Sequence, residues 1–120
     1  MVSAKEPRVR LQHILEQIDG IASATHGLTF EQIADSYLYA RVIERAVQII
    51  SEASKELPKE LRDMYPDVHW TPIIGIGNLL RHEYYRINAR DMWEIVKVHL
   101  PELRPVIVTM LADLNGGNSQ

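Results

Sequence analysis

The sequence predicts an all-α fold, a small antiparallel bundle of four to five helices. Apolar residues recur three and four positions apart along most of the chain, as in amphipathic helices. No segment shows the alternation of apolar and polar residues that a half-buried strand needs. Prolines and glycines divide the chain into segments of helical length, without an internal repeat. We therefore expect a single helical domain over residues 1–114 and a flexible tail over residues 115–120.

Composition and charge narrow the classes of function. The chain of 120 residues is 46% hydrophobic and 24% charged, which is ordinary for a globular domain. Its net charge of -3 argues against general coating of nucleic acid, although a local basic patch can still form. The absence of cysteine excludes disulfides and thiolate metal sites and is compatible with a reducing cytoplasm. Without a signal core or an apolar run of about 20 residues, we expect a cytoplasmic protein with no membrane contact.

The first half of the chain predicts two long helices. An amphipathic helix is expected over residues 6–24, ended by Thr-His-Gly at 25–27. Thr29 and Gln32 have the spacing of a capping box and predict the start of the next helix. Its apolar periodicity continues for about 26 residues, until Pro58 interrupts it.

The second half predicts a short helical turn and two further helices. The turn covers residues 58–65. Thr71 is expected to cap a fourth helix that ends near Tyr85. Asn88 is expected to cap a fifth helix, which Pro101 bends or interrupts.

The fourth helix carries the densest group of reactive side chains, in the stretch "GIGNLLRHEYYRI" at residues 75–87. Residues three and four apart share a helix face, so Asn78 is expected beside His82 and close to Arg81. An amide, an imidazole and a guanidinium can therefore converge at one helix end. The simpler alternative is that His82 is a surface histidine stabilised by the helix dipole.

Two glycines in this helix need an explanation, because each costs about 1 kcal/mol relative to alanine in a helix interior. A close helix contact, including one between two copies of the chain, is the structural alternative to a ligand site. We expect Gly75 to serve such packing. Gly77 is interpreted from a family resemblance.

The chain resembles the HepT-like toxins of the HEPN ribonuclease superfamily over nearly its whole length. The landmarks are an Ile-Ile-x-Glu-Ala run at 49–53, Tyr-Pro at 65–66 with Trp70, and Trp93 followed by Leu-Pro-x-Leu at 100–103. The resemblance implies a HEPN-like helical bundle that forms a homodimer. It also implies metal-independent cleavage of RNA, with no cofactor and no metal.

The functional motif of that family is an arginine four to six residues before a histidine, usually followed by asparagine, with a tyrosine two residues beyond the histidine. His82, Tyr84 and Asn78 occupy the corresponding positions, whereas the arginine falls on Gly77. Arg81 lies one turn further on the same face, about 6 Å along the axis, and is the first candidate to replace it.

The resemblance assigns each group a role. His82 would act as acid or base, Arg81 would bind the scissile phosphate, and Asn78 would position them. Lesser candidates for the phosphate-binding arginine are Arg41, Arg45 and Arg86.

The partners implied by the resemblance are RNA, a second copy of the chain that completes a composite cleft, and a separate nucleotidyltransferase. That nucleotidyltransferase would be the antitoxin of a toxin–antitoxin pair, and it would adenylylate Tyr84. The alternative is a catalytically silent HEPN module, because Gly77 replaces the family arginine. Such a module would only bind a nucleotidyltransferase or nucleic acid.

Overall fold

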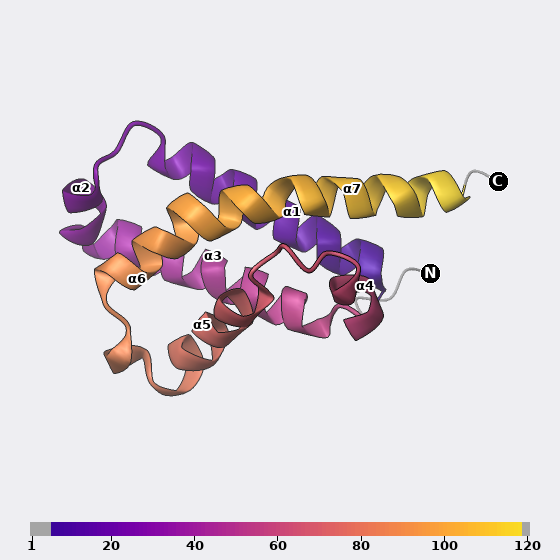
Figure 1. Cartoon of the computed structure of the whole chain (residues 1–120). Helices are drawn as coiled ribbons and strands as arrows, with labels where there is room; N and C mark the ends of the chain where they lie inside the picture. The colour runs from indigo at the N-terminus through magenta and orange to yellow at the C-terminus, as the bar shows by residue number, and fades with distance from the viewer. Residues whose placement is uncertain (1–5, 119–120) are drawn as a thin grey trace.

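The computed structural model describes residues 6–118, and every regular element among them is helical. In chain order the elements are α1 (Pro7–Thr25), α2 (Phe30–Ala34), α3 (Tyr37–Glu56), α4 (Lys59–Asp63), α5 (Trp70–His82), the 3-10 turn η1 (Tyr84–Arg86), α6 (Ala89–Glu94), the π-helical turn η2 (Ile95–His99) and α7 (Leu100–Asn118). In Figure 1, α1 runs opposite in direction to α3 and α7 and packs against both, while α5 packs on α3. The predicted all-α bundle is confirmed.

The predicted second helix is two helices. Its capping box is confirmed, because Thr29 Oγ1 accepts a hydrogen bond from Gln32 N and Gln32 Oε1 accepts one from Thr29 N. However, α2 ends after five residues, and Ser36 Oγ accepts a hydrogen bond of 3.1 Å from Tyr39 N to cap α3. A single continuous helix was therefore the wrong prediction, since a serine hydroxyl competes for the backbone and starts a new helix.

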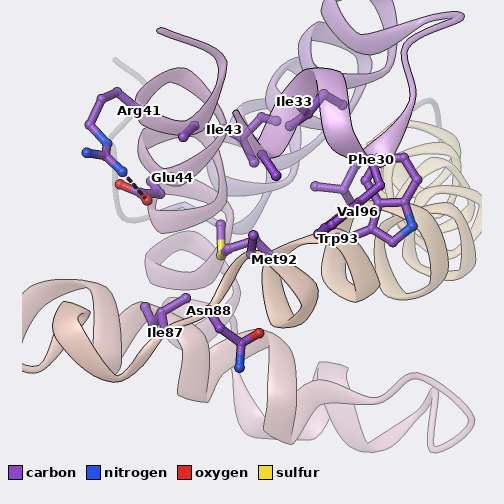
Figure 2. Close-up of a pocket in the computed structure, with 13 residues that line it drawn as sticks. Phe30, Ile33, Arg41, Ile43, Glu44, Ile87, Asn88, Met92, Trp93 and Val96 are labelled. Carbon is purple, nitrogen blue, oxygen red and sulfur yellow. Dashed lines mark hydrogen bonds and ion pairs between the residues drawn. The ribbon is translucent and has the colours of Figure 1, made fainter. Parts of the chain in front are cut away.

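The short helix α2 is held against α6 by aromatic packing. The rings of Phe30 and Trp93 meet edge to face with centroids 5.5 Å apart (Figure 2). The guanidinium of Arg90 lies 3.8 Å from the centre of the Phe30 ring. These contacts hold the first residue of α2 against α6.

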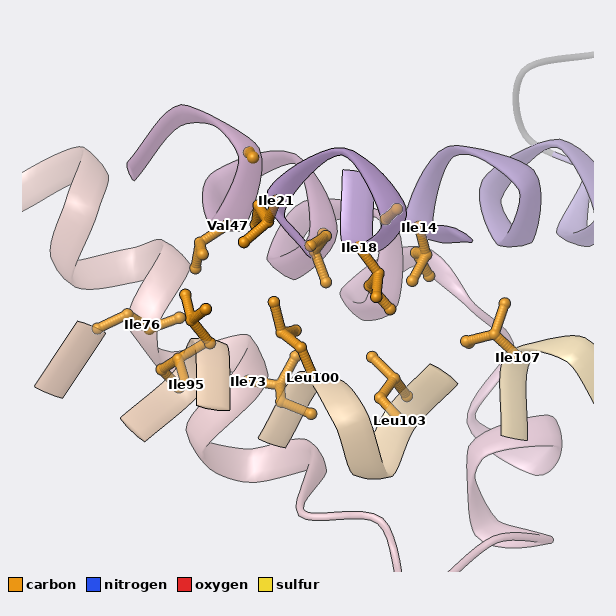
Figure 3. Close-up of a cluster of buried hydrophobic side chains, with 14 of the residues drawn as sticks. Ile14, Ile18, Ile21, Val47, Ile73, Ile76, Ile95, Leu100, Leu103 and Ile107 are labelled. Carbon is orange, nitrogen blue, oxygen red and sulfur yellow. The ribbon is translucent and has the colours of Figure 1, made fainter. Parts of the chain in front are cut away.

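The core consists of aliphatic side chains from α1, α3, α5, η2 and α7 (Figure 3). Ile14, Ile50 and Leu103 are fully buried within it. Burying one such side chain contributes about 1.5–3 kcal/mol relative to exposing it. The helical periodicity of the sequence therefore identified the faces that hold the bundle together.

Helix α5 begins and ends differently from the prediction. His69, not Thr71, occupies the N-cap position, and it makes no capping hydrogen bond through its side chain. Instead, Trp70 Nε1 donates to the carbonyl oxygens of Arg62 and Tyr65, each at 3.2 Å, and this anchors the start of the helix. The helix ends at His82, and the following tyrosines lie in η1.

The last part of the chain follows the predicted order with one irregularity. Asn88 Oδ1 accepts a hydrogen bond of 2.8 Å from Asp91 N, so the predicted cap of α6 is confirmed. The irregularity near Pro101 is η2, a wide turn directly before the proline, whose ring does not fit the carbonyl of the preceding turn of a regular helix. Helix α7 continues through Asn118, beyond the expected domain end at residue 114, and residues 119–120 lie outside the described range.

None of the described helices combines the length and the apolar character that crossing a bilayer demands.

Candidate functional site

Helix α5 approaches α3 most closely at Gly77. The residue is buried, and a Cβ atom built there would lie 2.6 Å from Ser51 Cβ and closer still to Ser51 Oγ. Ser51 Oγ donates a hydrogen bond of 2.8 Å to the carbonyl oxygen of Ile74, one turn earlier on α5. Glycine at position 77 therefore permits this contact between the two helices.

Gly75, to which the sequence assigned close helix packing, makes no such contact within the described chain, whereas its packing against a second copy of the chain stays a prediction. A Cβ atom at Gly75 would have no neighbour within 4 Å in the described chain. The close contact belongs to Gly77 because that position faces α3. An arginine at position 77 would have to enter space that Ser51 occupies.

The guanidinium of Arg81 is held at the end of α5. Arg81 Nη2 donates a hydrogen bond of 3.1 Å to Asn78 Oδ1, three residues earlier on the same helix. Arg81 Nη1 also lies 3.7 Å from Glu52 Oε1 on α3. The helical spacing therefore brings Arg81 and Asn78 into direct contact, while their roles in chemistry stay a prediction.

The imidazole of His82 is exposed at the last residue of α5. Among residues 6–118 its side chain has no hydrogen-bond or ion-pair partner. Gly75, Asn78 and His82 are spaced three, four and seven residues apart, so they share one face of the helix. A proton can therefore reach the ring from solvent or from a bound ligand.

Beside this helix end, α3 and α5 border an open groove of about 410 Å³. Its lining combines two tyrosines, two arginines and three other side chains: Tyr37, Arg41, Glu44, Arg45, Gln48, Leu80 and Tyr84. Basic groups beside aromatic faces suit single-stranded nucleic acid, because they pair with phosphates and stack on bases.

Arg41 stays charged in this groove. Its Nη2 donates a hydrogen bond of 2.9 Å to Glu44 Oε2, and its guanidinium lies 5.0 Å from the centre of the Tyr37 ring. The hydrogen bond to Glu44 is the main cause that raises the pKa of Arg41 above its usual value. Sequence reasoning named Arg41 and Arg45 as lesser candidates but missed Tyr37, because only folding brings the start of α3 beside the end of α5.

A second cavity, of about 180 Å³, lies between α2, α3 and α6 and is mainly apolar (Figure 2). Met92 and Trp93 line it, and the Arg41–Glu44 pair lies on its other side. His82, Arg81 and Asn78 border neither this cavity nor the open groove, and lie at the exposed end of α5.

The chain matches a known family. Residues 14–110 match the pattern of the family described as "Ribonuclease HepT-like". The chain belongs to the HepT-like ribonuclease family. No solved structure matches it.

Three relatives illustrate the similarity. The chain is 36% identical over 107 residues to "Putative RNase TTE0752" of Caldanaerobacter subterraneus subsp. tengcongensis, covering 89% of this chain and 96% of the relative. It is 30% identical over 112 residues to "Putative RNase MJ0127" of Methanocaldococcus jannaschii, covering 93% of each. It is 30% identical over 94 residues to "Probable ribonuclease HepT" of Thermococcus cleftensis, covering 78% of this chain and 86% of the relative.

Proposed function

We propose that this chain is the ribonuclease toxin subunit of a toxin–antitoxin pair and cleaves RNA without a metal ion. The observation that carries the proposal is the exposed imidazole of His82 at the end of α5, one residue after Arg81, whose guanidinium is hydrogen-bonded to Asn78. Membership in a ribonuclease family supports the assignment of RNA as the substrate.

His82 supplies the proton transfer. The 2′-oxygen of the substrate attacks phosphorus while the bond from phosphorus to the 5′-oxygen breaks, giving a cyclic phosphate and a free 5′-hydroxyl. The imidazole either takes the proton from the 2′-hydroxyl or gives one to the departing oxygen. Imidazole suits either task, because one ring nitrogen can accept a proton and the other can donate one.

Arg81 neutralises the charge that builds on phosphorus. Its contact with Glu52 is 3.7 Å long, and both side chains are more than a third exposed. Such a pair contributes less than about 1 kcal/mol, so a phosphate can displace the carboxylate. The hydrogen bond to Asn78 then keeps the guanidinium directed along the helix face.

A second copy of the chain would separate the acid and base roles of His82. One imidazole in each protomer allows one copy to take the proton while the other gives one. The open space at Gly75, on the face that carries His82, supports close approach of a partner helix there. We therefore propose a composite cleft between two α5 helices, with the groove of Arg41 and Tyr37 guiding the RNA strand on each side.

The cleavage proposal is tested with purified protein and RNA in excess EDTA. We expect cleavage that leaves 2′,3′-cyclic phosphate ends, and sedimentation of the same preparation as a dimer. The His82→Ala variant, prepared identically, controls for contaminating ribonuclease. Absence of cleavage by the natural chain would instead favour a catalytically silent module that binds a nucleotidyltransferase or nucleic acid. The glycine at position 77, in place of the family arginine, is the observation that favours this alternative.

Tyr84 is the proposed site of control by a nucleotidyltransferase antitoxin on a separate chain. Its side chain is 62% exposed and lines the groove beside Arg41. An adenylyl group there would fill the groove and place negative charge against its arginines. With ATP and the nucleotidyltransferase, mass spectrometry should find one adenylyl group on Tyr84.

The neighbouring tyrosine is a matched control for this modification. Tyr85 is 76% exposed, so accessibility alone would favour it. Tyr84→Phe is expected to lose the added mass and Tyr85→Phe to retain it. Equal labelling of the two variants would contradict the assignment.

A further inference from the structure

Three side chains that the proposed cleavage does not use gather at the opposite end of α5. They are His69 at the N-cap of α5, His99 at the end of η2, and Glu102 in the first turn of α7. Each side chain offers one nitrogen or oxygen atom that could bind a metal ion, and these three atoms lie within 4.8 Å of one another. His69 Nδ1 is 3.2 Å from Glu102 Oε2, and the two imidazole rings have centroids 5.3 Å apart.

Two imidazoles and one carboxylate are a ligand set typical of zinc. With metal–ligand bonds of about 2.0–2.1 Å, two ligands of a tetrahedral ion lie about 3.3 Å apart. The pair formed by His69 and Glu102 already has this separation. No separation exceeds 4.8 Å, so none has to shrink by more than about 1.5 Å, which side-chain rotation can supply at exposed positions.

The wide turn η2 presents His99 to the cluster. Leu100 N donates to the carbonyl oxygen of Ile95, five residues earlier, so the turn contains one residue more than a regular helix. His99 and Glu102 are three residues apart and therefore share a face. His99 Nδ1 is buried and has no hydrogen-bond partner among the described residues.

An ordinary hydrogen bond between His69 and Glu102 would explain only part of this arrangement. It leaves unexplained why a third ligand-type ring packs against His69 while its own buried nitrogen has no partner. A metal ion would account for all three side chains together.

We propose that His69, His99 and Glu102 form a zinc-binding site whose fourth position is filled by water. The ion would connect the start of α5 to the start of α7, so its role is structural. It would lie far from the proposed catalytic histidine, because the 13 residues of α5 separate the two ends by about 20 Å. This proposal departs from the expectation of a chain without metal, whereas the proposed RNA cleavage at His82 needs no metal ion.

The test uses the full chain after removal of metal with EDTA and dialysis. Titration with Zn²⁺ in a calorimeter is expected to show one ion per chain. At zinc concentrations about a hundredfold above Kd, the Tm should rise by about 5–10 °C. Substitution with Co²⁺ should give the visible absorption of a tetrahedral ion.

Variants of exposed side chains identify the ligands. His69→Gln and Glu102→Gln are each expected to weaken zinc binding at least tenfold, whereas His26→Gln at the end of α1 should bind as the natural chain does. The side chains of His69 and Glu102 are 60% and 48% exposed, so both variants should fold, as circular dichroism without metal will check. Unchanged affinity in both variants, or no zinc binding and no tetrahedral Co²⁺ spectrum in the natural chain, would overturn the proposal.

Discussion

Replacing His82 by alanine should lower the rate of RNA cleavage by about 10²- to 10⁴-fold, the range that a positioned acid or base contributes. The Tm should be unchanged, since the imidazole is exposed and no described side chain bonds to it. The measurement is kcat on a fixed RNA in EDTA, together with a thermal melt. His13→Ala, an exposed histidine on α1, is the matched control and should retain full activity.

Substitution of Arg81 tests whether its guanidinium takes part in catalysis or only contributes positive charge. Arg81→Ala should reduce cleavage by about 10²- to 10³-fold, as expected when a group that stabilises transition-state charge is removed. Arg104→Ala removes the same charge from an exposed position on α7 that pairs with Asp19, and should change the rate little. Retained cleavage in both His82→Ala and Arg81→Ala would show that this end of α5 is not the catalytic site.

Gly77→Ala should destabilise the protein by about 1–3 kcal/mol, which is the usual cost of overpacking a buried contact. The destabilisation follows from Ser51, whose Cβ would lie 2.6 Å from the new Cβ. Gly20→Ala is the matched control, because no atom lies within 4 Å of a Cβ at that position in α1. The control should gain up to about 1 kcal/mol from helix propensity alone. Both values can be measured by urea denaturation.

The same contact predicts a rescue. In a Ser51→Gly background the space beside Gly77 is open, so adding Gly77→Ala should no longer be destabilising. If Gly77→Ala stabilised the natural chain as much as Gly20→Ala does, the close approach of α3 and α5 would be refuted.

Short-range signals were sufficient to predict most of the fold. The caps at Thr29 and Asn88 depend on side chains three residues from their partners, so the sequence displays them directly. The cap at Ser36 was equally local, but the uninterrupted apolar periodicity around it outweighed a single hydroxyl in the prediction. The contact between Arg81 and Asn78 was predictable for the same reason of spacing.

What could not be predicted depends on contacts between distant parts of the chain. Ser51 and Ile74 are 23 residues apart, and His69 and Glu102 are 33 residues apart. Nothing in the local sequence shows which turn of α5 faces α3, so the packing role was assigned to Gly75 instead of Gly77. The groove between α3 and α5 and the cluster at His69 were missed for the same reason.

The contact between Ser51 and Gly77 also limits the order in which this sequence can change. With the serine side chain in place, the Cβ atom of any larger residue at position 77, including arginine, meets it. A lineage that gained arginine at 77 would therefore have to lose the serine side chain at 51 first, or pass through an unstable intermediate. The two positions are therefore expected to change together. Relatives with arginine at the position equivalent to 77 should carry a residue at the position equivalent to 51 that leaves room for it.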